Sequence, residues 1–178
     1  MAKKFDLRKY IRDVPDYPKP GIIFKDITPL LQNPLARHYA IKAMEDAIKK
    51  NNLESNVVAG IEARGFIFAS VLAQQMRLPL VPIRKEGKLP WKTLKEQYSM
   101  EYDTATLEIH QDAVVKGQNV LICDDLMATA GTALAAIKLV EKLGANIAGL
   151  LFLIELSYLK GRENLGNYNI ISLIQYDE

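Results

Sequence analysis

The chain has 178 residues, of which 49% are hydrophobic and 25% charged, and its net charge is +2. These proportions are typical of one soluble globular domain and exclude intrinsic disorder, a collagen-like chain and a coiled coil. The net charge is too small to indicate nucleic-acid binding, and the longest apolar run, residues 147–154, is far shorter than the ~20 residues of a membrane span. We therefore expect no nucleic-acid partner and no membrane partner.

Cysteine usage indicates the compartment. Cys123 is the single cysteine, so no disulfide can form within the chain, and a reducing environment is expected. Residues 1–8 carry charges with no apolar run behind them, which is not the pattern of a secretory signal. Both observations predict a cytoplasmic protein.

Prolines and a glycine interrupt the first thirty residues, where we expect no regular element except a short helix over about residues 5–14. The first strong helix signal is Asn33-Pro34, which places an N-cap residue before a proline at the first helical position. Apolar residues at helical spacing extend this helix to about Lys50.

After this helix the chain alternates between strands and helices. The expected helices are residues 66–76 and 132–143, the second ended by Gly144. The expected strands are residues 57–61, 80–83, 98–102, 106–110, 119–123, 147–156 and 170–174, of which 98–102 and 106–110 form a hairpin or excursion. Most of these strands are apolar throughout, which predicts a mostly parallel sheet covered on both faces. The fold class is therefore a doubly wound α/β fold, in one domain over residues 1–178.

Charged residues gather in two neighbouring stretches. Residues 84–95 hold five basic side chains and one acid, whereas residues 96–125 hold seven acids and one base. A solvated surface explains such stretches, and so does a basic patch that binds a polyanion beside acids that bind hydroxyls or a metal ion. Charge alone leaves both interpretations open.

The segment with the clearest chemistry is residues 119–132. A buried strand delivers Asp124 and Asp125 at its carboxyl end, and a turn of small residues, 128–132, then opens a helix. In open α/β sheets ligands bind at the carboxyl ends of strands, and the free N–H groups of a helix start attract phosphate. Two adjacent carboxylates suit the vicinal hydroxyls of a ribose, so the segment predicts a ribose 5-phosphate site. The alternative is that an aspartate caps a turn and the small residues only permit close packing.

Residues 121–132 resemble the phosphoribosyl diphosphate (PRPP) motif of the type I phosphoribosyltransferases. Residues 15–29, 60–68 and 83–90 resemble one branch of that family, the adenine phosphoribosyltransferases, and the tail at residues 156–162 fits the same branch. Residues 98–103 with 107–110 are similar to the mobile catalytic loop of that branch. The resemblance covers essentially the whole chain. Ala69, Asp103 and Ala130 stand where the family usually has glycine.

The resemblance implies a type I phosphoribosyltransferase fold, with residues 1–32 as a small N-terminal hood within the same domain. It implies that adenine and PRPP react to give AMP and diphosphate. It also implies that Mg²⁺ is held mainly by PRPP oxygens and water, with no metal ligand from the protein, and that the chain forms a homodimer.

The same resemblance assigns roles to individual residues. Asp124 and Asp125 would hold the ribose hydroxyls, and the 5-phosphate would be cradled by Ala128, Thr129, Ala130, Gly131 and Thr132. The diphosphate would be bound by Arg64, Lys85 and Lys88. Adenine would stack between Phe24 and Leu126, and its edge would be read by main-chain groups of Ile23 and Lys25. Glu101 would handle the proton of the base.

Two rival functions are considered, of which one is not an enzyme and the other is a phosphoribosyltransferase for another base. A non-enzymatic sensor of purines or PRPP needs an output domain, for which a single domain leaves no room. A phosphoribosyltransferase for a 6-oxopurine or a pyrimidine would differ in the base-reading segments, where the pattern around Phe24 favours adenine. Conversion of adenine separates the enzyme from the sensor, and a comparison of nucleobases separates the two transferases.

Overall fold

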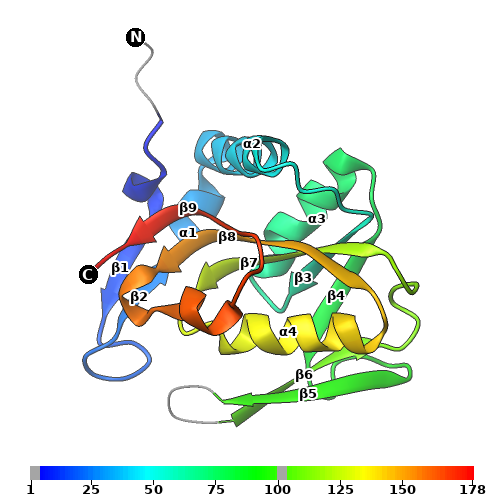
Figure 1. Ribbon diagram of the computed structural model, residues 1–178. Helices are drawn as coiled ribbons and strands as arrows, with labels where there is room; N and C mark the ends of the chain where they lie inside the picture. Colours follow the sequence, from blue (N-terminus) through cyan, green and yellow to red (C-terminus); the bar gives the residue numbers. More distant parts are fainter. Residues whose placement is uncertain (1–4, 100–103) are drawn as a thin grey trace.

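The computed structural model describes residues 5–99 and 104–178, which form a seven-stranded sheet with helices on both faces (Figure 1). The strand order is β5-β6-β4-β3-β7-β8-β9, in which β4, β3, β7, β8 and β9 run parallel and the β5–β6 hairpin joins β4 in the antiparallel direction. The strands are β3 (Val57–Ile61), β4 (Leu80–Lys85), β5 (Thr93–Ser99), β6 (Thr104–His110), β7 (Asn119–Met127), β8 (Asn146–Leu156) and β9 (Ile170–Tyr176). The predicted doubly wound α/β fold is confirmed.

Two hydrophobic cores lie on opposite faces of this sheet. Helices α2 (Pro34–Lys50) and α3 (Gly65–Met76) cover one face, and α4 (Gly131–Lys142) covers the other (Figure 1). Successive residues of β7 serve the two cores in turn: Ile122 packs on the α4 side, and Leu121 and Cys123 pack on the α2 and α3 side. Because both faces of the central strands are buried, these strands are apolar throughout. No helix in the described ranges has the length and apolarity needed to cross a membrane.

The helix signals in the sequence are confirmed where capping residues define them. The side chain of Asn33 accepts a hydrogen bond from the Ala36 N–H at 2.9 Å, and α2 begins at Pro34. Gly144 follows the end of α4 with φ +79°, a conformation that glycine adopts at little cost.

The expectation of an irregular N-terminal segment is wrong. The expected helix over residues 5–14 is only a 3-10 helix, η1 (Leu7–Tyr10), and β1 (Arg12–Pro15) pairs with β2 (Ile23–Asp26) in an antiparallel hairpin followed by α1 (Thr28–Gln32). The breakers lie in the turn of this hairpin, where Gly21 has φ +86° and its N–H donates to Asp16 Oδ1 at 2.8 Å. Proline and glycine therefore build a turn here and do not prevent pairing.

Two predicted strands are longer than the sequence indicates. β5 begins at Thr93, not Tyr98, because its residues pair along the whole of β6. β7 continues through the acidic pair to Met127, which pairs with Glu155 of β8. Asp124 and Asp125 thus lie on a strand that is held in place by its pairing with β8.

The topology defines where a ligand can bind. β3 lies between β4 and β7, and its crossover to β4 runs through α3 on one face, whereas β7 continues into α4 on the other face. The sheet is therefore wound in opposite directions from the β3–β7 pair, which opens a crevice at the carboxyl ends of these strands.

One close contact sets the distance between α3 and the sheet. A Cβ placed on Gly60 of β3 would lie 2.8 Å from the Ala69 Cβ of α3 and 3.2 Å from the ring of Phe66. Gly60→Ala should therefore lower the free energy of unfolding by about 1–3 kcal/mol, the usual cost of overpacking.

The partner of this contact provides the control. Ala69→Gly alone costs about 1 kcal/mol of helix propensity, but it removes the methyl group that clashes in Gly60→Ala. Urea unfolding measures the free energy of unfolding of both single variants and of the double variant. The double variant should lose less of this free energy than the sum of the losses in the two single variants. Strict additivity would mean that this contact does not limit the approach of α3.

Candidate active site

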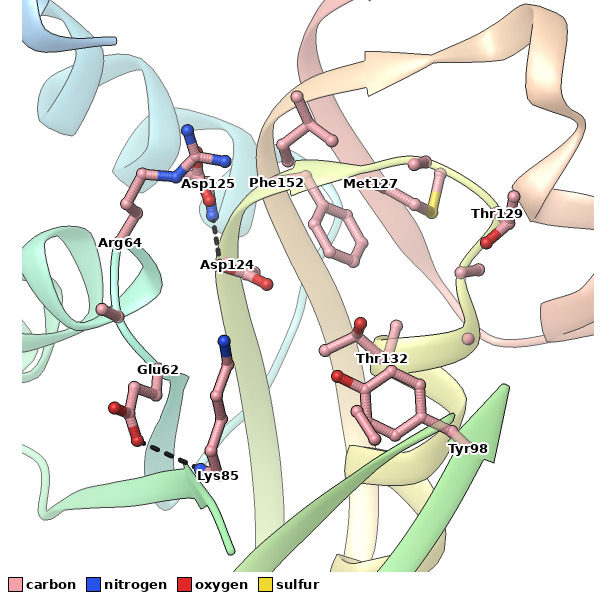
Figure 2. Close-up of a pocket in the computed structure, with 17 residues that line it drawn as sticks. Glu62, Arg64, Lys85, Tyr98, Asp124, Asp125, Met127, Thr129, Thr132 and Phe152 are labelled. Atoms are coloured by element: carbon pink, nitrogen blue, oxygen red, sulfur yellow. Dashed lines mark hydrogen bonds and ion pairs between the residues drawn. The ribbon is translucent and has the colours of Figure 1, made fainter. Parts of the chain in front are cut away.

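A cavity of about 350 Å³ lies at the carboxyl ends of β3 and β7. Its walls come from segments that are distant in sequence, since β5 contributes Tyr98 and β8 contributes Phe152 (Figure 2). The lining residues are Glu62, Ala63, Arg64, Lys85, Tyr98, Ala105, Asp124, Asp125, Leu126, Met127, Ala128, Thr129, Ala130, Gly131, Thr132, Ala133 and Phe152. The structure thus brings together the acidic pair, the small-residue loop, Arg64 and Lys85, which the sequence predicted as one site.

The acidic pair lies at the end of β7, with Asp124 half-buried and Asp125 only 4% exposed. Asp124 Oδ1 accepts a hydrogen bond from the Asp125 N–H at 2.8 Å (Figure 2). Arg64 Nε forms an ion pair with Asp125 Oδ2 at 2.9 Å, yet this buried oxygen accepts no well-aligned hydrogen bond from any described residue. It is therefore available to a hydroxyl donor from a ligand.

Burial shifts the pKa values of both aspartates. Burial and the neighbouring charge of Asp125 raise the pKa of Asp124 well above 3.8. Burial also raises the pKa of Asp125, although the positive charge of Arg64 acts in the opposite direction. Carboxylates with raised pKa values in a cavity are typical of functional sites, because a ligand can satisfy groups that the protein itself leaves unsatisfied.

Arg64 reaches Asp125 because α3 starts very close to β7. A Cβ on Gly65, the first residue of α3, would lie 2.8 Å from both the Cys123 carbonyl oxygen and Asp124 Oδ1. Glycine is therefore required at this position for the helix start to approach the strand. The guanidinium of Arg64 also lies over the ring of Phe24, 4.8 Å from its centroid.

The loop of residues 128–132 ends in the first turn of α4. Its N-cap residue, Ala130, has φ +69°, and no side chain among residues 5–99 and 104–178 caps the helix. The first N–H groups of α4 therefore face the cavity without a side-chain acceptor, which is the arrangement that binds phosphate. The left-handed conformation costs an alanine about 1 kcal/mol relative to glycine, as expected for the residue that replaces the family's glycine.

Of the two predicted lysines, only Lys85 lines the cavity, where its side chain extends toward Asp124 (Figure 2). Glu62 positions the backbone of Lys85, because Glu62 Oε2 accepts a hydrogen bond from the Lys85 N–H at 3.0 Å and another from Arg84 Nε at 3.1 Å. Although burial alone would raise the pKa of Glu62, these hydrogen bonds hold it below its usual value. Lys88 lies outside the cavity lining, and its N–H donates to Glu108 Oε1 at 2.9 Å.

The predicted adenine-binding residues divide into two groups. Leu126 lines the cavity, whereas Ile23, Phe24 and Lys25 lie on β2 outside the lining, where Phe24 adjoins the site through Arg64. The side chain of Lys25 is buried. Its Nζ lies 2.8 Å from Asp13 Oδ1 and 4.0 Å from the centroid of the Tyr176 ring, so only the main chain of Lys25 is free to face a ligand.

Seven lining residues were missed by the sequence analysis: Glu62, Ala63, Tyr98, Ala105, Met127, Ala133 and Phe152. Glu62 lies between two residues of a matched block, Gly60 and Arg64, and could have been found there. Met127 and Tyr98 also lie in matched blocks, 121–132 and 98–103, whereas Phe152 carries no local signal, because only the packing of β8 brings it to the cavity. Glu101, the predicted catalytic residue, lies outside the described residues.

The chain was compared with known proteins. A family model described as the phosphoribosyl transferase domain matches residues 26–173, which places the chain in the phosphoribosyltransferase class. The adenine phosphoribosyltransferase of Thermosipho melanesiensis is 52% identical over 171 residues, covering 96% of this chain and 97% of the relative. The chain belongs to the adenine phosphoribosyltransferase family.

Solved structures of this family have the same fold. The adenine phosphoribosyltransferase of Thermoanaerobacter pseudethanolicus matches with a TM-score of 0.92 and 48% identity, over 96% of this chain and 98% of that one. The enzyme of Saccharomyces cerevisiae matches with a TM-score of 0.88 and 37% identity, over 93% and 95% of the two chains. The yeast structure is a complex with adenine and an imino-altritol bisphosphate.

The raised pKa of Asp124 leads to a prediction about stability. Asp124→Asn should raise the free energy of unfolding at neutral pH, because ionisation of the half-buried aspartate beside Asp125 costs free energy in the folded chain that an amide avoids. The gain should be absent below the ordinary pKa of 3.8, where Asp124 is protonated in both states. It should grow as the pH rises from there, by on the order of 1 kcal/mol for each pH unit of the shift.

Urea unfolding over a series of pH values measures this gain. Asp112→Asn is the control, because it removes the same charge from an exposed side chain. An Asp124→Asn variant that is no more stable than the control near neutral pH would contradict the raised pKa.

Proposed function

We propose that this chain transfers the 5-phosphoribosyl group from PRPP to adenine, giving AMP and diphosphate in purine salvage. The observation that carries the proposal is that one cavity contains both a buried carboxylate oxygen, which accepts no well-aligned hydrogen bond from the described residues, and a helix start that no described side chain caps. The first suits a ribose hydroxyl and the second a phosphate. The yeast relative, which was solved with adenine and a bisphosphate, supports the same substrates.

Asp124 and Asp125 hold the ribose, and the 128–132 loop holds the 5-phosphate. Ionised Asp125 accepts a hydrogen bond from a ribose hydroxyl at Oδ2, the oxygen that is ion-paired with Arg64 but accepts no well-aligned hydrogen bond from the described residues. The N–H groups at the start of α4 and the hydroxyls of Thr129 and Thr132 surround the phosphate. The sugar is thereby fixed at two ends, which leaves its anomeric carbon free to react.

Arg64 and Lys85 stabilise the leaving group. As the bond at the anomeric carbon breaks, negative charge grows on the diphosphate, and preformed cations beside it lower the barrier. Both side chains line the cavity, and a guanidinium can contact two phosphate oxygens at once. Lys88 is proposed as a third contact on the family resemblance alone.

Main-chain groups of β2 read the edge of adenine. The Ile22 carbonyl oxygen accepts at 3.2 Å from the N–H of Tyr17, which lies two residues after β1, so this carbonyl group points to the β1 side of the hairpin. Because main-chain direction alternates along a strand, the N–H and C=O groups of Ile23 and Lys25 face away from β1. This orientation supports their proposed role, in which adenine stacks on Phe24 and Leu126.

Further parts of the proposal rest on the family resemblance. Glu101 is proposed to move the proton of the base. The carboxylate oxygens of Asp124 and Asp125 in the cavity suit Mg²⁺, which would be held mainly by PRPP oxygens and water and would supply positive charge to the diphosphate. A homodimer is proposed, and a cytoplasmic location is consistent with the single cysteine, whose thiol is buried.

The nucleobase preference tests the function. With PRPP and Mg²⁺, adenine should be converted to AMP, whereas hypoxanthine should react roughly 10⁴-fold less efficiently, because it reverses the donor and acceptor that the main chain meets. Chromatography of reactions with adenine, hypoxanthine, guanine and uracil measures the four rates. Comparable conversion of adenine and hypoxanthine would leave only the broader class of phosphoribosyltransferase.

The ribose assignment has its own test. Asp125→Asn keeps the size of the side chain but removes the charge. The fall in kcat/KM for PRPP should correspond to a loss of about 1.5–3 kcal/mol of transition-state stabilisation, which is the cost of losing a charge-assisted hydrogen bond. The KM for adenine should change little. A folded variant with wild-type kinetics for PRPP would show that Asp125 does not bind the ribose.

A further inference from the structure

The segment after β8 packs directly against the 128–132 loop. A Cβ on Gly161, the first residue of the 3-10 helix η3 (Gly161–Leu165), would lie only 2.2 Å from the Ala128 carbonyl oxygen. Asn164 Nδ2 donates a hydrogen bond to the Thr129 carbonyl oxygen at 3.0 Å. Gly161 and Asn164 are not among the cavity-lining residues, so they contact the loop from behind.

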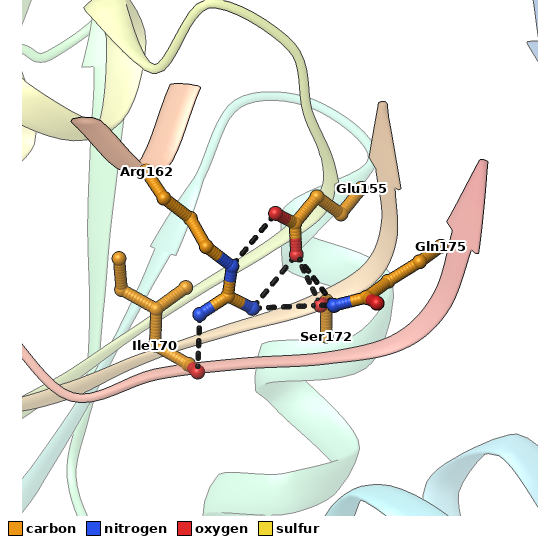
Figure 3. Close-up of polar contacts among 5 residues, drawn as sticks. All are labelled: Glu155, Arg162, Ile170, Ser172 and Gln175. Carbon is orange, nitrogen blue, oxygen red and sulfur yellow. Dashed lines mark hydrogen bonds and ion pairs between the residues drawn. The ribbon is translucent and has the colours of Figure 1, made fainter. Parts of the chain in front are cut away.

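The same helix is fastened to the sheet by Arg162 (Figure 3). Its guanidinium forms a two-pronged contact with the buried Glu155 of β8, through Nε to Oε1 and Nη2 to Oε2, each at 2.7 Å. It also donates to the Ile170 carbonyl oxygen at 3.1 Å and to Ser172 Oγ at 3.0 Å, both on β9. The position of η3 therefore follows that of β8 and β9.

Glu155 is satisfied within this cluster and does not face a ligand. Besides Arg162, its Oε2 accepts from Ser172 Oγ and from Gln175 Nε2, the latter at 3.2 Å. Although burial alone would raise the pKa of Glu155, the hydrogen bonds from Arg162 hold it below its usual value. The carboxylate thus remains charged and holds Arg162 in one orientation.

The loop needs such support because its backbone conformation is not intrinsically favoured. Ala130 has φ +69°, which costs a residue with a Cβ about 1 kcal/mol, and such conformations persist only where surrounding structure imposes them. Leu165, at the end of η3, is 2% exposed and belongs to the same hydrophobic cluster as Ala130. The backbone of the loop is therefore held at Ala128 and Thr129, and the side chain of Ala130 is held by the core.

We propose that Arg162 and Asn164 are positioning residues that brace the 128–132 loop and thereby set the affinity of the site for the 5-phosphate group. Neither residue touches the substrate. This inference rests on the proposed function, because it takes the loop to be the 5-phosphate site.

Asn164→Ala is the sharpest test, because the side chain is exposed and its loss removes one hydrogen bond to the loop. We expect KM for PRPP to rise about three- to tenfold, as for one lost hydrogen bond, while KM for adenine stays unchanged. The Kd for ribose 5-phosphate, measured by calorimetry, should rise by the same factor. The matched control is Asn167→Ala, an exposed asparagine whose side chain makes no hydrogen bond within residues 5–99 and 104–178.

Arg162→Lys tests the other half of the brace. Lysine keeps a positive charge beside Glu155 but lacks the planar fork that also reaches Ile170 and Ser172, so the same rise in KM for PRPP and in Kd for ribose 5-phosphate is expected. Arg162→Ala is avoided, because an unpaired buried carboxylate would compromise folding. Thermal melting of each variant shows how far stability changes.

The outcomes separate this inference from the proposed function. A wild-type protein that makes no AMP from adenine and PRPP overturns the proposed function. If the wild type is active and both variants keep the wild-type KM for PRPP and Kd for ribose 5-phosphate, the brace is overturned. It is also overturned if the variants only melt at lower temperature, or if KM rises equally for PRPP and adenine.

Discussion

The cavity depends on the close approach of the start of α3 to the end of β7. Gly65 makes this approach possible, since any Cβ there would meet the backbone and the side chain of the strand. The residue before it, Arg64, is thereby placed against Asp125, and its guanidinium also covers Phe24. One steric constraint thus joins the acidic pair, a cation and the N-terminal hairpin.

The carboxylates of this protein fall into two groups with opposite chemistry. Glu62, Glu108 and Glu155 accept several hydrogen bonds from neighbouring donors, and their pKa values lie below the usual one despite burial. Asp124 and Asp125 have fewer donors, and burial raises their pKa values. The first group holds backbone segments in place around the cavity, whereas the second is left for a ligand to satisfy.

The support around the cavity is built in the same way on two sides. Glu108 accepts from the N–H groups of Lys88 and Leu89 and so shapes the turn that follows Lys85. Glu155 holds Arg162, and through it the 3-10 helix behind the phosphate loop. In both cases a buried, charged acceptor organises a segment that would otherwise be free to vary, and the residues facing the cavity keep their orientation before a ligand binds.

Local chemistry was sufficient to predict much of the fold and part of the site. The Asn33-Pro34 pair determined the start of α2, and the fully apolar strands indicated a parallel sheet with two covered faces. The acidic pair followed by small residues indicated a ligand at a strand end. Each of these features depends only on neighbours in sequence or on burial, so it can be predicted from the amino-acid sequence.

Only the tertiary structure decided the remaining features, because they depend on contacts between distant segments. The hairpin of β1 and β2 was missed, since breakers such as Gly21 form its turn and pairing creates its strands. Tyr98 and Phe152 reach the cavity only because β5 and β8 are packed beside it. The cluster of Glu155, Arg162 and Ser172 likewise requires the parallel pairing of β8 with β9. A sequence records which residues can pair or pack, whereas the order and pairing of the strands in the folded sheet determine which of them meet.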